Sequence, residues 1–568
     1  MRKLNLCLII CFGLLTTSAW AHFPRPTSAE NGMVASAHPL ATKAGVSILE
    51  AGGNAVDAAI ATTFAISVVE PFSAGIGGGG FLMLYDEKTN STQALDFRER
   101  APLSATREMY HKNGKADPLL SRDGYKSIAV PGTVNGMWTL HQKYGKLPWK
   151  KVVAPAIRLA EKGFAVGWPF VFMTNWRLEL LNQNKEAKRV FTHRGKPYEE
   201  GDILIQKNLA TTLRRIAKNP NDFYTGRTAK LMVQDAKANG GLLTAEDLKT
   251  YQSIWRKPVC GDFMKHQICS MPPPSSGGVH LIQILNLIDG PKMKKLGWRH
   301  PDALHHLIES MRTAYADRAA HLGDPDFFPV PVESLISKAY AQERLKEIPK
   351  HKARTSAETV AATSEQVKRF ANNPESPDTS HLTVVDKDRL VVSLTFTINY
   401  PFGSGMVAKG TGVVMNDEMD DFAIAPGVPN AYGLVGGEAN SVAAKKTPLS
   451  SMTPFVVTKN KNFAFAGGSP GGSTIITTSL QLIINRLVYG MTATQAVYTP
   501  KIHQQWLPDY IDVEPYGLDH STWKKLEKRG HKLQLRDPWG NANLIVETPE
   551  GKLEGSADPR GEGSALGH

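Results

Sequence analysis

The chain has 568 residues, a formal net charge of +13, a hydrophobic fraction of 42% and four cysteines. Its Lys and Arg residues are scattered among acidic ones, unlike the clustered basic and aromatic pattern of nucleic-acid-binding proteins. We therefore expect no nucleic-acid partner, and a mildly basic, solvated surface that favours small anionic substrates. The ordinary hydrophobic content allows a large core, and no internal repeat or interdomain linker divides the chain.

The first 21 residues have the pattern of an export signal. Arg2 and Lys3 give a positive start, an apolar stretch covers Leu4–Leu15, and Ala19–Ala21 forms a small-residue cleavage site before His22. The apolar stretch is too short to span a bilayer as a helix, and no later stretch is long enough. An uncleaved membrane anchor is the alternative. We predict a mature protein that is periplasmic or secreted and has no membrane attachment.

Two helices are predicted at the start of the mature chain. The pattern is helical over Pro39–Glu50, and Asn54 caps a second helix that reaches Val69. The run Gly75–Gly80 matches G-x-G-x-x-G, but a helix precedes it and a strand over Phe81–Tyr85 follows. A dinucleotide-binding fingerprint has the reverse order. We interpret the run as a tight backbone turn beside the core.

A strand over Ala94–Phe97 presents Arg98 at its end. A single Arg in this position is usually a surface or structural cation, and substrate binding is the alternative. Apolar periodicity further predicts scaffold helices over Trp149–Lys162, Asn208–Lys218, Thr225–Ala238 and Pro301–Ala320.

Two cysteines remain after signal removal, Cys260 and Cys269, and both lie in a predicted hairpin over Pro258–Met271. A two-residue turn at Met264-Lys265 places them opposite each other. A disulfide is expected in an oxidising compartment, and two buried thiols are the equally weighted alternative. No second pair of ligands lies at zinc-site spacing, so no metal site is predicted.

A polar segment over His351–Asp378 has the composition of a mobile loop and ends directly before Thr379. Thr at the start of a strand has an ordinary explanation, because β-branched residues favour strands. The alternative is an N-terminal nucleophile. Cleavage of the Asp378–Thr379 bond would create an α-amine with a pKa of roughly 7.7–8.0, which can act as the base for the Thr379 hydroxyl.

Two β-patterned runs follow, over His381–Val385 and Leu390–Ile398. If they pair through a three-residue loop at Lys387–Arg389, Thr379 lies directly opposite Thr397. A loop one residue shorter would place an apolar Phe there instead. The register therefore decides whether a second hydroxyl faces the candidate nucleophile.

Three later groups have both ordinary and chemical interpretations. The acidic residues Glu418, Asp420 and Asp421 suit a solvated loop or a calcium site. Ser450-Ser451 suits a turn. Gly471-Gly472 precedes an apolar-periodic helix over residues 473–489, where backbone N–H groups lack helical partners. Such donors could form an oxyanion hole.

Taken together, these motifs resemble the bacterial γ-glutamyltranspeptidases (glutathione hydrolases), which are N-terminal-nucleophile hydrolases. The resemblance extends from about Gly32 to Arg560. The matching blocks are Ala35–Phe81, Ala94–Pro102, Pro273–Gly278, Thr379–Phe422, Pro426–Asn440, Pro448–Pro454, Gly467–Thr478 and Ser556–Arg560. One departure is Ser380, where the family usually has Thr; the hydroxyl is retained.

The resemblance implies a mixed α and β fold, a four-layer αββα sandwich. It also implies autocatalytic cleavage between Asp378 and Thr379 into a large fragment (22–378) and a small catalytic fragment (379–568), which together form one domain. The implied partners are glutathione and other γ-glutamyl compounds, with amino acid or dipeptide acceptors. No metal or organic cofactor is implied.

The resemblance also assigns roles to individual residues. Thr379 is the nucleophile, Thr397 orients it, and Gly471 and Gly472 stabilise the oxyanion. The implied ligands of the substrate's α-carboxylate are Arg98, Ser450 and Ser451, those of its α-ammonium are Asn399, Glu418 and Asp421, and Tyr432 belongs to a covering lid over Pro429–Gly437.

Two alternatives remain from the sequence. Related acylases cleave cephalosporin side chains or poly-γ-glutamate, although the lid-like segment with Tyr432 is typical of transpeptidases. A periplasmic amino-acid-binding protein could use the same charged contacts without turnover. Two fragments on a denaturing gel would favour the enzyme, and a single chain would favour the binding protein.

Overall fold

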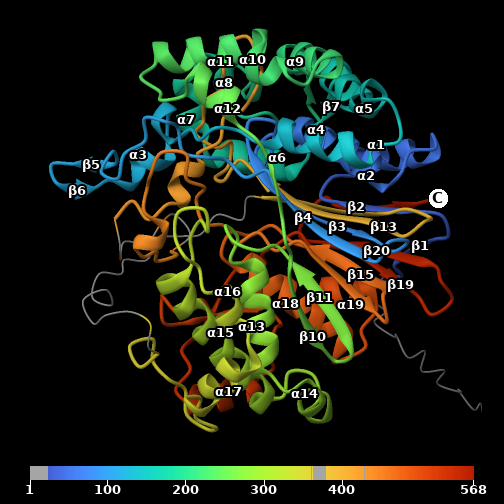
Figure 1. The fold of residues 1–568 in the computed structure, drawn as a ribbon, viewed down its shortest axis with the longest axis vertical. Coiled ribbons are helices and arrows are strands. Elements are labelled where there is room, and N and C mark those ends of the chain that lie inside the picture. Colours follow the sequence, from blue (N-terminus) through green and yellow to red (C-terminus); the bar gives the residue numbers. More distant parts are fainter. Residues whose placement is uncertain (1–23, 360, 362–378, 426, 428–429, 431–432) are drawn as a thin grey trace, which may run out of the picture.

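The structure is a computed structural model that describes residues 24–359, 361, 379–425, 427, 430 and 433–568. Two seven-stranded sheets lie face to face at its centre, and helices cover the outer face of each (Figure 1). The predicted four-layer αββα arrangement is confirmed.

The first sheet contains the candidate nucleophile's strand near its middle. Its strands, in spatial order, are β21 (Ser564–Gly567), β2 (Met33–Ser36), β12 (Ser380–Val385), β13 (Leu390–Thr397), β3 (Gly79–Asp86), β4 (Ser91–Asp96) and β9 (Ile254–Arg256). Every neighbouring pair is antiparallel. Segments on both sides of the Asp378–Thr379 bond therefore interleave in one sheet.

The second sheet is built in the same way. Its strands, in spatial order, are β1 (Thr27–Ala29), β20 (Leu553–Ala557), β19 (Asn543–Glu547), β15 (Asn462–Gly468), β14 (Phe455–Lys459), β11 (His266–Ser270) and β10 (Val259–Phe263). An apolar layer fills the space between the sheets and includes Met33, Phe81, Met83, Val391, Val456 and Ile545. Both sheets thus bury strands from both sides of the predicted cleavage point.

Helices α1–α12 lie mainly on the side of the first sheet (Figure 1). They are α1 (Pro39–Glu50), α2 (Ala55–Val69), α3 (Pro118–Arg122), α4 (Thr133–Tyr144), α5 (Trp149–Lys162), α6 (Trp168–Trp176), α7 (Leu178–Gln183), α8 (Lys185–Phe191), α9 (Lys207–Lys218), α10 (Asp222–Thr225), α11 (Arg227–Ala238) and α12 (Ala245–Thr250). The predicted cap is confirmed, because the Asn54 side chain accepts from the Asp57 N–H and the Asp57 side chain accepts from the Asn54 N–H.

Helices α13–α20 lie on the side of the second sheet (Figure 1). They are α13 (Gly277–Leu287), α14 (Gly290–Leu296), α15 (Pro301–His321), α16 (Val332–Leu335), α17 (Lys338–Lys346), α18 (Thr474–Leu487), α19 (Ala493–Tyr498) and α20 (His520–Lys528). Short elements complete the fold: β5 (His111–Lys112), β6 (Lys115–Ala116), β7 (Phe164–Ala165), β8 (Ile203–Leu204), β16 (Ile502–His503), β17 (Ile511–Val513), β18 (Leu533–Leu535), η1 (Tyr125–Ser127), η3 (Glu418–Asp421) and η4 (Glu438–Asn440).

The predicted first residue of one helix was wrong. The sequence pattern predicted a helix over Thr225–Ala238, but α10 ends at Thr225 and α11 begins at Arg227. The carboxylate of Asp222 accepts hydrogen bonds from the backbone N–H groups of Arg227 (2.9 Å) and Thr228 (3.3 Å). This cap starts a new helix after Gly226, since it satisfies N–H groups that lack helical partners.

The predicted cysteine hairpin has the expected register. Strands β10 and β11 pair Cys260 directly with Cys269, and Met264 and Lys265 both have positive φ in the two-residue turn. In the structure the two sulfur atoms are joined in a disulfide.

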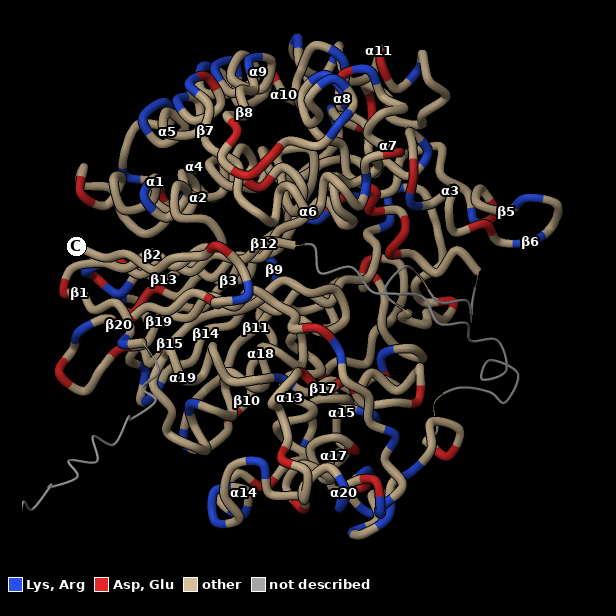
Figure 2. The backbone as a smooth tube through the Cα atoms, turned by 180° about the vertical axis from the view of Figure 1, so that it is seen from behind, with Lys and Arg blue, Asp and Glu red and all other residues tan. Residues whose placement is uncertain are grey.

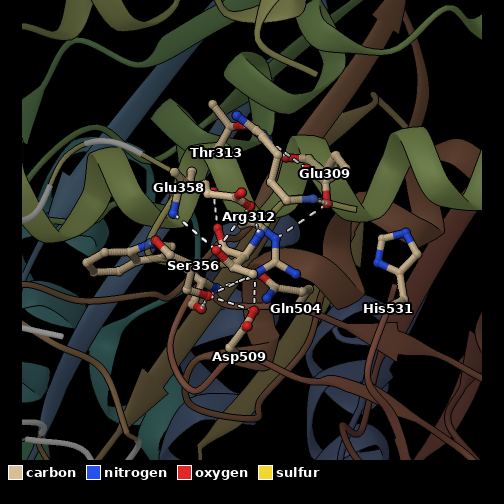
Figure 3. A network of polar contacts seen from close by, with 12 residues as sticks. Glu309, Arg312, Thr313, Ser356, Glu358, Gln504, Asp509 and His531 are labelled. Atoms are coloured by element: carbon tan, nitrogen blue, oxygen red, sulfur yellow. Dashed lines mark hydrogen bonds and ion pairs between the residues drawn. The ribbon is translucent and has the colours of Figure 1, made fainter. Parts of the chain in front are cut away.

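A buried polar network ties the segment before the candidate cleavage point to the second helical layer (Figure 3). Arg312 on α15 forms an ion pair with Asp509 and donates to Ser356 Oγ at 2.8 Å. Arg354 pairs with Glu309 on the same helix at 2.7 Å. Residues 354–356 are therefore fixed to the body of the protein shortly before the polar segment.

Basic and acidic residues are interspersed along the outer helices on both sides of the molecule (Figure 2). Among the described residues, no helix is both long and apolar enough to cross a membrane.

Candidate active site

The two threonines predicted to face each other do so. Ser380 on β12 pairs with Phe396 on β13, which confirms the three-residue loop and sets Thr379 beside Thr397. The Thr379 hydroxyl donates to Thr397 Oγ1 at 3.4 Å, and Thr397 Oγ1 also accepts from the Asn399 N–H at 2.8 Å. Both threonines are buried, so the candidate nucleophile has a partner with a fixed position.

The glycine run Gly75–Gly80 supports this end of β13, as the predicted backbone turn. A Cβ added at Gly78 would lie 1.9 Å from the carbonyl oxygen of Thr397, and one at Gly80 would lie 2.4 Å from that of Thr395. Any side chain there would displace the strand that carries Thr397. Glycine is needed because two backbones approach closely.

A narrow pocket opens beside Thr379 and brings together residues that are distant in the sequence. The pocket is lined by residues that the sequence predicted for the site: Arg98, Thr379, Thr397, Asn399, Glu418, Asp421, Ser450, Ser451 and Gly472. Four further residues complete the lining: Arg318, Leu434, Met452 and Ile475. Gly471 is adjacent in the chain but does not line this pocket. Its φ of 131° is in the region that favours glycine, and a Cβ there would lie 2.5 Å from Thr474 Oγ1.

Arg98 lies at the centre of the charged part of this pocket. It is 1% exposed, forms an ion pair with Glu418 at 2.6 Å and a second one with Asp421. Burial lowers the pKa of Arg98, but the carboxylates of Glu418 and Asp421 raise it by more, so the guanidinium stays charged. The resemblance assigns the cation and the acids to separate substrate groups and does not predict their direct pairing.

The acids around Arg98 respond to the same burial. Burial raises the pKa of Glu418 well above its usual value, against the lowering effect of Arg98. Burial likewise raises the pKa of Glu99, to about 7, again opposed by Arg98. Asp420 points elsewhere and accepts from Ser121 Oγ at 2.7 Å. In the part of the chain that the structure describes, no group of three or more acids, histidines or cysteines is arranged to hold a metal ion.

Asn399 follows Thr397 and turns the chain towards these acids. Its φ of 75° is in the left-handed region, which Asn tolerates better than most residues. Its side-chain amide donates to the Asp417 carbonyl oxygen at 3.1 Å. The turn thus connects the strand of Thr397 to η3, which carries Glu418 and Asp421.

The serine pair is held by backbone and side-chain bonds to residues 274–276. The Ser450 N–H donates to the Pro274 carbonyl at 2.9 Å, and the Ser450 carbonyl accepts from the Ser276 hydroxyl at 2.8 Å. The Ser451 hydroxyl accepts from Arg318 at 3.3 Å. The Ser450 hydroxyl accepts from the Met452 N–H at 3.1 Å, so both hydroxyl groups have partners in the protein at the pocket wall.

Comparisons with known proteins identify the family of this chain. The sequence profile of the family described as gamma-glutamyltranspeptidase matches residues 41–568. The chain belongs to this family. It is 44% identical over 538 residues to the glutathione hydrolase proenzyme of Escherichia coli (strain K12), an alignment that covers 94% of this chain and 91% of that protein.

The structure of this γ-glutamyltranspeptidase family member is similar to solved structures of a γ-glutamyltranspeptidase and of a cephalosporin acylase. The structure of Helicobacter pylori γ-glutamyltranspeptidase has a TM-score of 0.56 and 41% identity, and covers 62% of this chain and 99% of that chain. The structure of cephalosporin acylase from Bacillus halodurans has a TM-score of 0.85 and 29% identity, and covers 97% of this chain and 98% of that chain.

Ser380, the one departure noted from the γ-glutamyltranspeptidase pattern, makes a hydrogen bond through its hydroxyl. Its hydroxyl donates to Glu70 Oε2 at 2.9 Å. Serine provides this hydrogen bond as threonine would, so the substitution leaves the contact next to Thr379 in place.

Two predicted positions lie outside the described residues: Asp378 and Tyr432. The described part of the predicted lid does reach the site. Asn430 donates to Asp421 Oδ1 at 3.2 Å, and Leu434 lines the pocket.

Arg318 is a pocket residue that the sequence analysis missed. It is 5% exposed, donates to Ser276 Oγ at 3.1 Å and to Ser451 Oγ, and forms no ion pair within the described ranges. Burial lowers its pKa to about 10, against the raising effects of Tyr315 and Asp421. Its position in the last turn of a predicted scaffold helix gave no signal, because a cation there commonly complements the helix dipole.

Proposed function

We propose that this protein is an exported γ-glutamyl transferase and hydrolase that acts on glutathione and related γ-glutamyl compounds. The observation that carries the proposal is the buried Thr379–Thr397 hydroxyl pair at the edge of a small pocket with both cationic and anionic groups. Membership of the γ-glutamyltranspeptidase family supports it.

The charged groups suit the α-ammonium and α-carboxylate of a γ-glutamyl group. Arg98 with Ser450 and Ser451 would bind the carboxylate, since a guanidinium can meet both of its oxygens. Asn399, Glu418 and Asp421 would bind the ammonium. Arg98 also pairs with Glu418 and Asp421. An entering zwitterion adds one charge of each sign, so it leaves the net charge of the site unchanged.

The proposed reaction is acyl transfer through an ester. Cleavage before Thr379 creates its α-amine, which takes the hydroxyl proton as Thr379 Oγ1 attacks the γ-carbonyl carbon. Thr397 orients that hydroxyl. Backbone N–H groups of Gly471 and Gly472 stabilise the oxyanion, and the leaving amine takes the proton as the C–N bond breaks. Water or an acceptor amine then attacks the ester carbonyl and releases Thr379.

Fragments 22–378 and 379–568 would remain associated as a heterodimer after cleavage. The sheet order supports this, since β12 and β13 lie between β2 and β3, and β14 lies beside β11. Separating the fragments would expose the apolar layer between the sheets, which hydrophobic burial opposes.

An acylase that removes cephalosporin side chains is the second candidate, favoured by the high structural similarity to the Bacillus halodurans enzyme. The pocket argues for the first candidate. An α-ammonium pairs with the acids Glu418 and Asp421, whereas a glutaryl-type side chain keeps the carboxylate for Arg98 but has no ammonium to pair with these acids.

The test is incubation of the purified, processed protein with glutathione, with and without glycylglycine, beside a glutaryl amide that lacks the α-amine. We expect release of glutamate from glutathione, formation of γ-glutamyl-glycylglycine when the dipeptide is present, and much slower cleavage of the glutaryl amide. Equal or faster glutaryl cleavage would favour the acylase. A processed protein that cleaves neither substrate would contradict both assignments.

A further inference from the structure

The net positive charge of the chain is concentrated in one region. Residues 141–240 contain 19 Lys and Arg and 8 Asp and Glu, whereas the remaining residues after the predicted signal contain 45 basic and 45 acidic ones. Acidic residues are interspersed with basic ones along the whole chain, so the difference becomes clear only when charge is counted by region. A local excess of this size creates an electrostatic field that attracts anionic partners.

This region forms the outermost helices on the side of the first sheet. Helix α9 packs on α5, α5 packs on α2, and α2 packs on β12. Figure 2 shows Lys and Arg along α5, α8 and α9 at this outer edge of the molecule. Seventeen basic residues of the region are exposed, against four acidic ones: Glu161, Glu179, Glu199 and Glu200. Basic side chains therefore dominate the surface of this layer.

Two of these helices carry exposed basic residues at the same spacing, i, i+7 and i+11, which places them on one helix face. They are Lys151, Arg158 and Lys162 on α5, and Lys207, Arg214 and Lys218 on α9. Arg214 forms an ion pair with Glu161 on α5, so the two basic stripes lie side by side. Within the described ranges, the other five basic residues form no ion pair. Most of this positive charge is therefore not neutralised by the protein itself.

Two large aliphatic side chains are exposed where the stripes meet. The short strand β7 follows α5 and pairs with β8, which precedes α9. Ile203 and Ile205 are 55% and 43% exposed, and a Cβ added at Gly163 would lie 2.8 and 2.7 Å from their side chains. They therefore lie beside the end of α5, next to Lys162, and shortly before Lys207. Exposed aliphatic groups among basic ones are typical of surfaces that bind at a membrane interface.

We propose that the α5–α9 face, made of the two basic stripes with Ile203 and Ile205, binds an anionic lipid bilayer peripherally. The basic side chains pair with lipid phosphates, and the two isoleucine side chains enter the headgroup region. Two adjacent helices give a broad surface, which suits a bilayer better than the groove that a single-stranded polyanion occupies. The inference goes beyond the proposed function and does not depend on it.

This orientation leaves the candidate active site accessible. No residue of the α5–α9 face lines the narrow pocket that contains Thr379. Helix α2 and the first sheet separate the face from the second sheet. Since salt screens the attraction between exposed charges, we expect the attachment to be reversible and to weaken as ionic strength rises.

The experiment measures the partition coefficient of the purified protein by co-sedimentation with vesicles. One set contains equal parts of phosphatidylglycerol and phosphatidylcholine, and the reference set contains phosphatidylcholine alone. A test variant removes two charges from each stripe: Lys151→Gln, Lys162→Gln, Lys207→Gln and Lys218→Gln. A matched control removes four exposed charges from α14 and α20, at the opposite end of the molecule (Figure 2): Lys294→Gln, Lys295→Gln, Lys525→Gln and Lys528→Gln.

We expect wild type to bind the anionic vesicles and not the reference vesicles. The test variant should lower the partition coefficient by at least about 10-fold, and the control by less than about threefold. Equal unfolding midpoints for the three proteins would show that lost binding does not reflect misfolding. Absence of wild-type binding, equal binding to both vesicle sets, or equal losses in the two variants would overturn the inference. Binding to soluble polyphosphate without binding to anionic vesicles would also overturn it.

A second arm tests the apolar contact. Ile203→Ser should lower the partition coefficient by about fivefold. Leu119→Ser is the control, since Leu119 on α3 is an equally exposed aliphatic residue (57%) outside the face, and it should change binding by less than about twofold. Equal effects of the two substitutions would overturn the insertion of isoleucine. Hydrolysis of γ-glutamyl-p-nitroanilide without vesicles should be the same in all these variants, so the proposed function is tested separately.

Discussion

At the scale of single residues, the candidate site depends on groups whose positions are fixed by backbone pairing and by burial. Thr379 meets Thr397 because a three-residue loop sets the strand register. Arg98 pairs with Glu418 and Asp421 because a buried guanidinium has no water with which to form hydrogen bonds. Each of these contacts predicts a different kinetic consequence when the residue is changed.

Thr397→Val keeps the shape of the side chain and removes the hydroxyl that faces Thr379. We expect kcat to fall by roughly 10–10³, the range for loss of a positioned hydrogen-bonding group. The measurement is steady-state kinetics on protein that has split into two fragments. An unchanged kcat would show that Thr397 only packs.

Arg98→Lys keeps the charge but replaces a planar fork with a point charge on a flexible stem. We expect a higher KM for γ-glutamyl-p-nitroanilide and a fall in kcat/KM of roughly 10–10³, or about 1.4–4 kcal/mol. Cleavage at Thr379 should survive, because that step uses no external substrate. Near-wild-type kcat/KM would leave Arg98 as a structural cation.

Arg318→Lys tests a residue that positions Ser451 rather than one that contacts the reacting atoms. Lysine cannot meet Ser276 and Ser451 together as the guanidinium does. We expect KM to rise by about 10-fold while kcat changes by less than about threefold. A general loss of folding would lower the yield of the two fragments, and an equal fall in kcat would argue against a positioning role.

At the scale of elements, the strand pairing and the Asn54 cap were predictable, and the break between α10 and α11 was not. The hairpin over Cys260 and Cys269 and the pairing of β12 with β13 follow from loop length and side-chain alternation. The break between α10 and α11 depends on the hydrogen bond from the Arg227 N–H to the Asp222 carboxylate. The periodicity of apolar residues carries no information about this bond.

The buried network at the end of the large fragment gives an element-scale prediction (Figure 3). Arg312→Met should destabilise the protein by about 3 kcal/mol, because Asp509 then keeps only the exposed Lys532 and Glu309 keeps only Arg354. Lys532→Met is the matched control, since Lys532 pairs with the same Asp509 at 3.3 Å but is 70% exposed; its effect should stay below about 1 kcal/mol. The free energy of unfolding of both variants is measured by denaturant unfolding. Equal losses in Arg312→Met and Lys532→Met would contradict the stabilising role assigned to Arg312.

At the scale of the whole molecule, the sequence predicted the layers and most of the site through resemblance and register. It could not predict Arg318 or the pairing of Arg98 with Glu418, because both depend on how α15 and η3 approach the sheet. The exposure of Trp168, Phe172 and Trp176 on α6 could not be predicted for a similar reason, because aromatic residues at this spacing look like core residues until the tertiary structure leaves them exposed.

The central claim is that one precursor becomes two interleaved fragments with Thr379 as the new N-terminal nucleophile. Intact mass spectrometry of the purified protein and of its Thr379→Ala variant tests this most directly. We predict that wild type gives a fragment that begins at Thr379, and that Thr379→Ala remains one inactive chain. A single wild-type chain with full activity, or a Thr379→Ala protein that still splits before residue 379, would contradict the account.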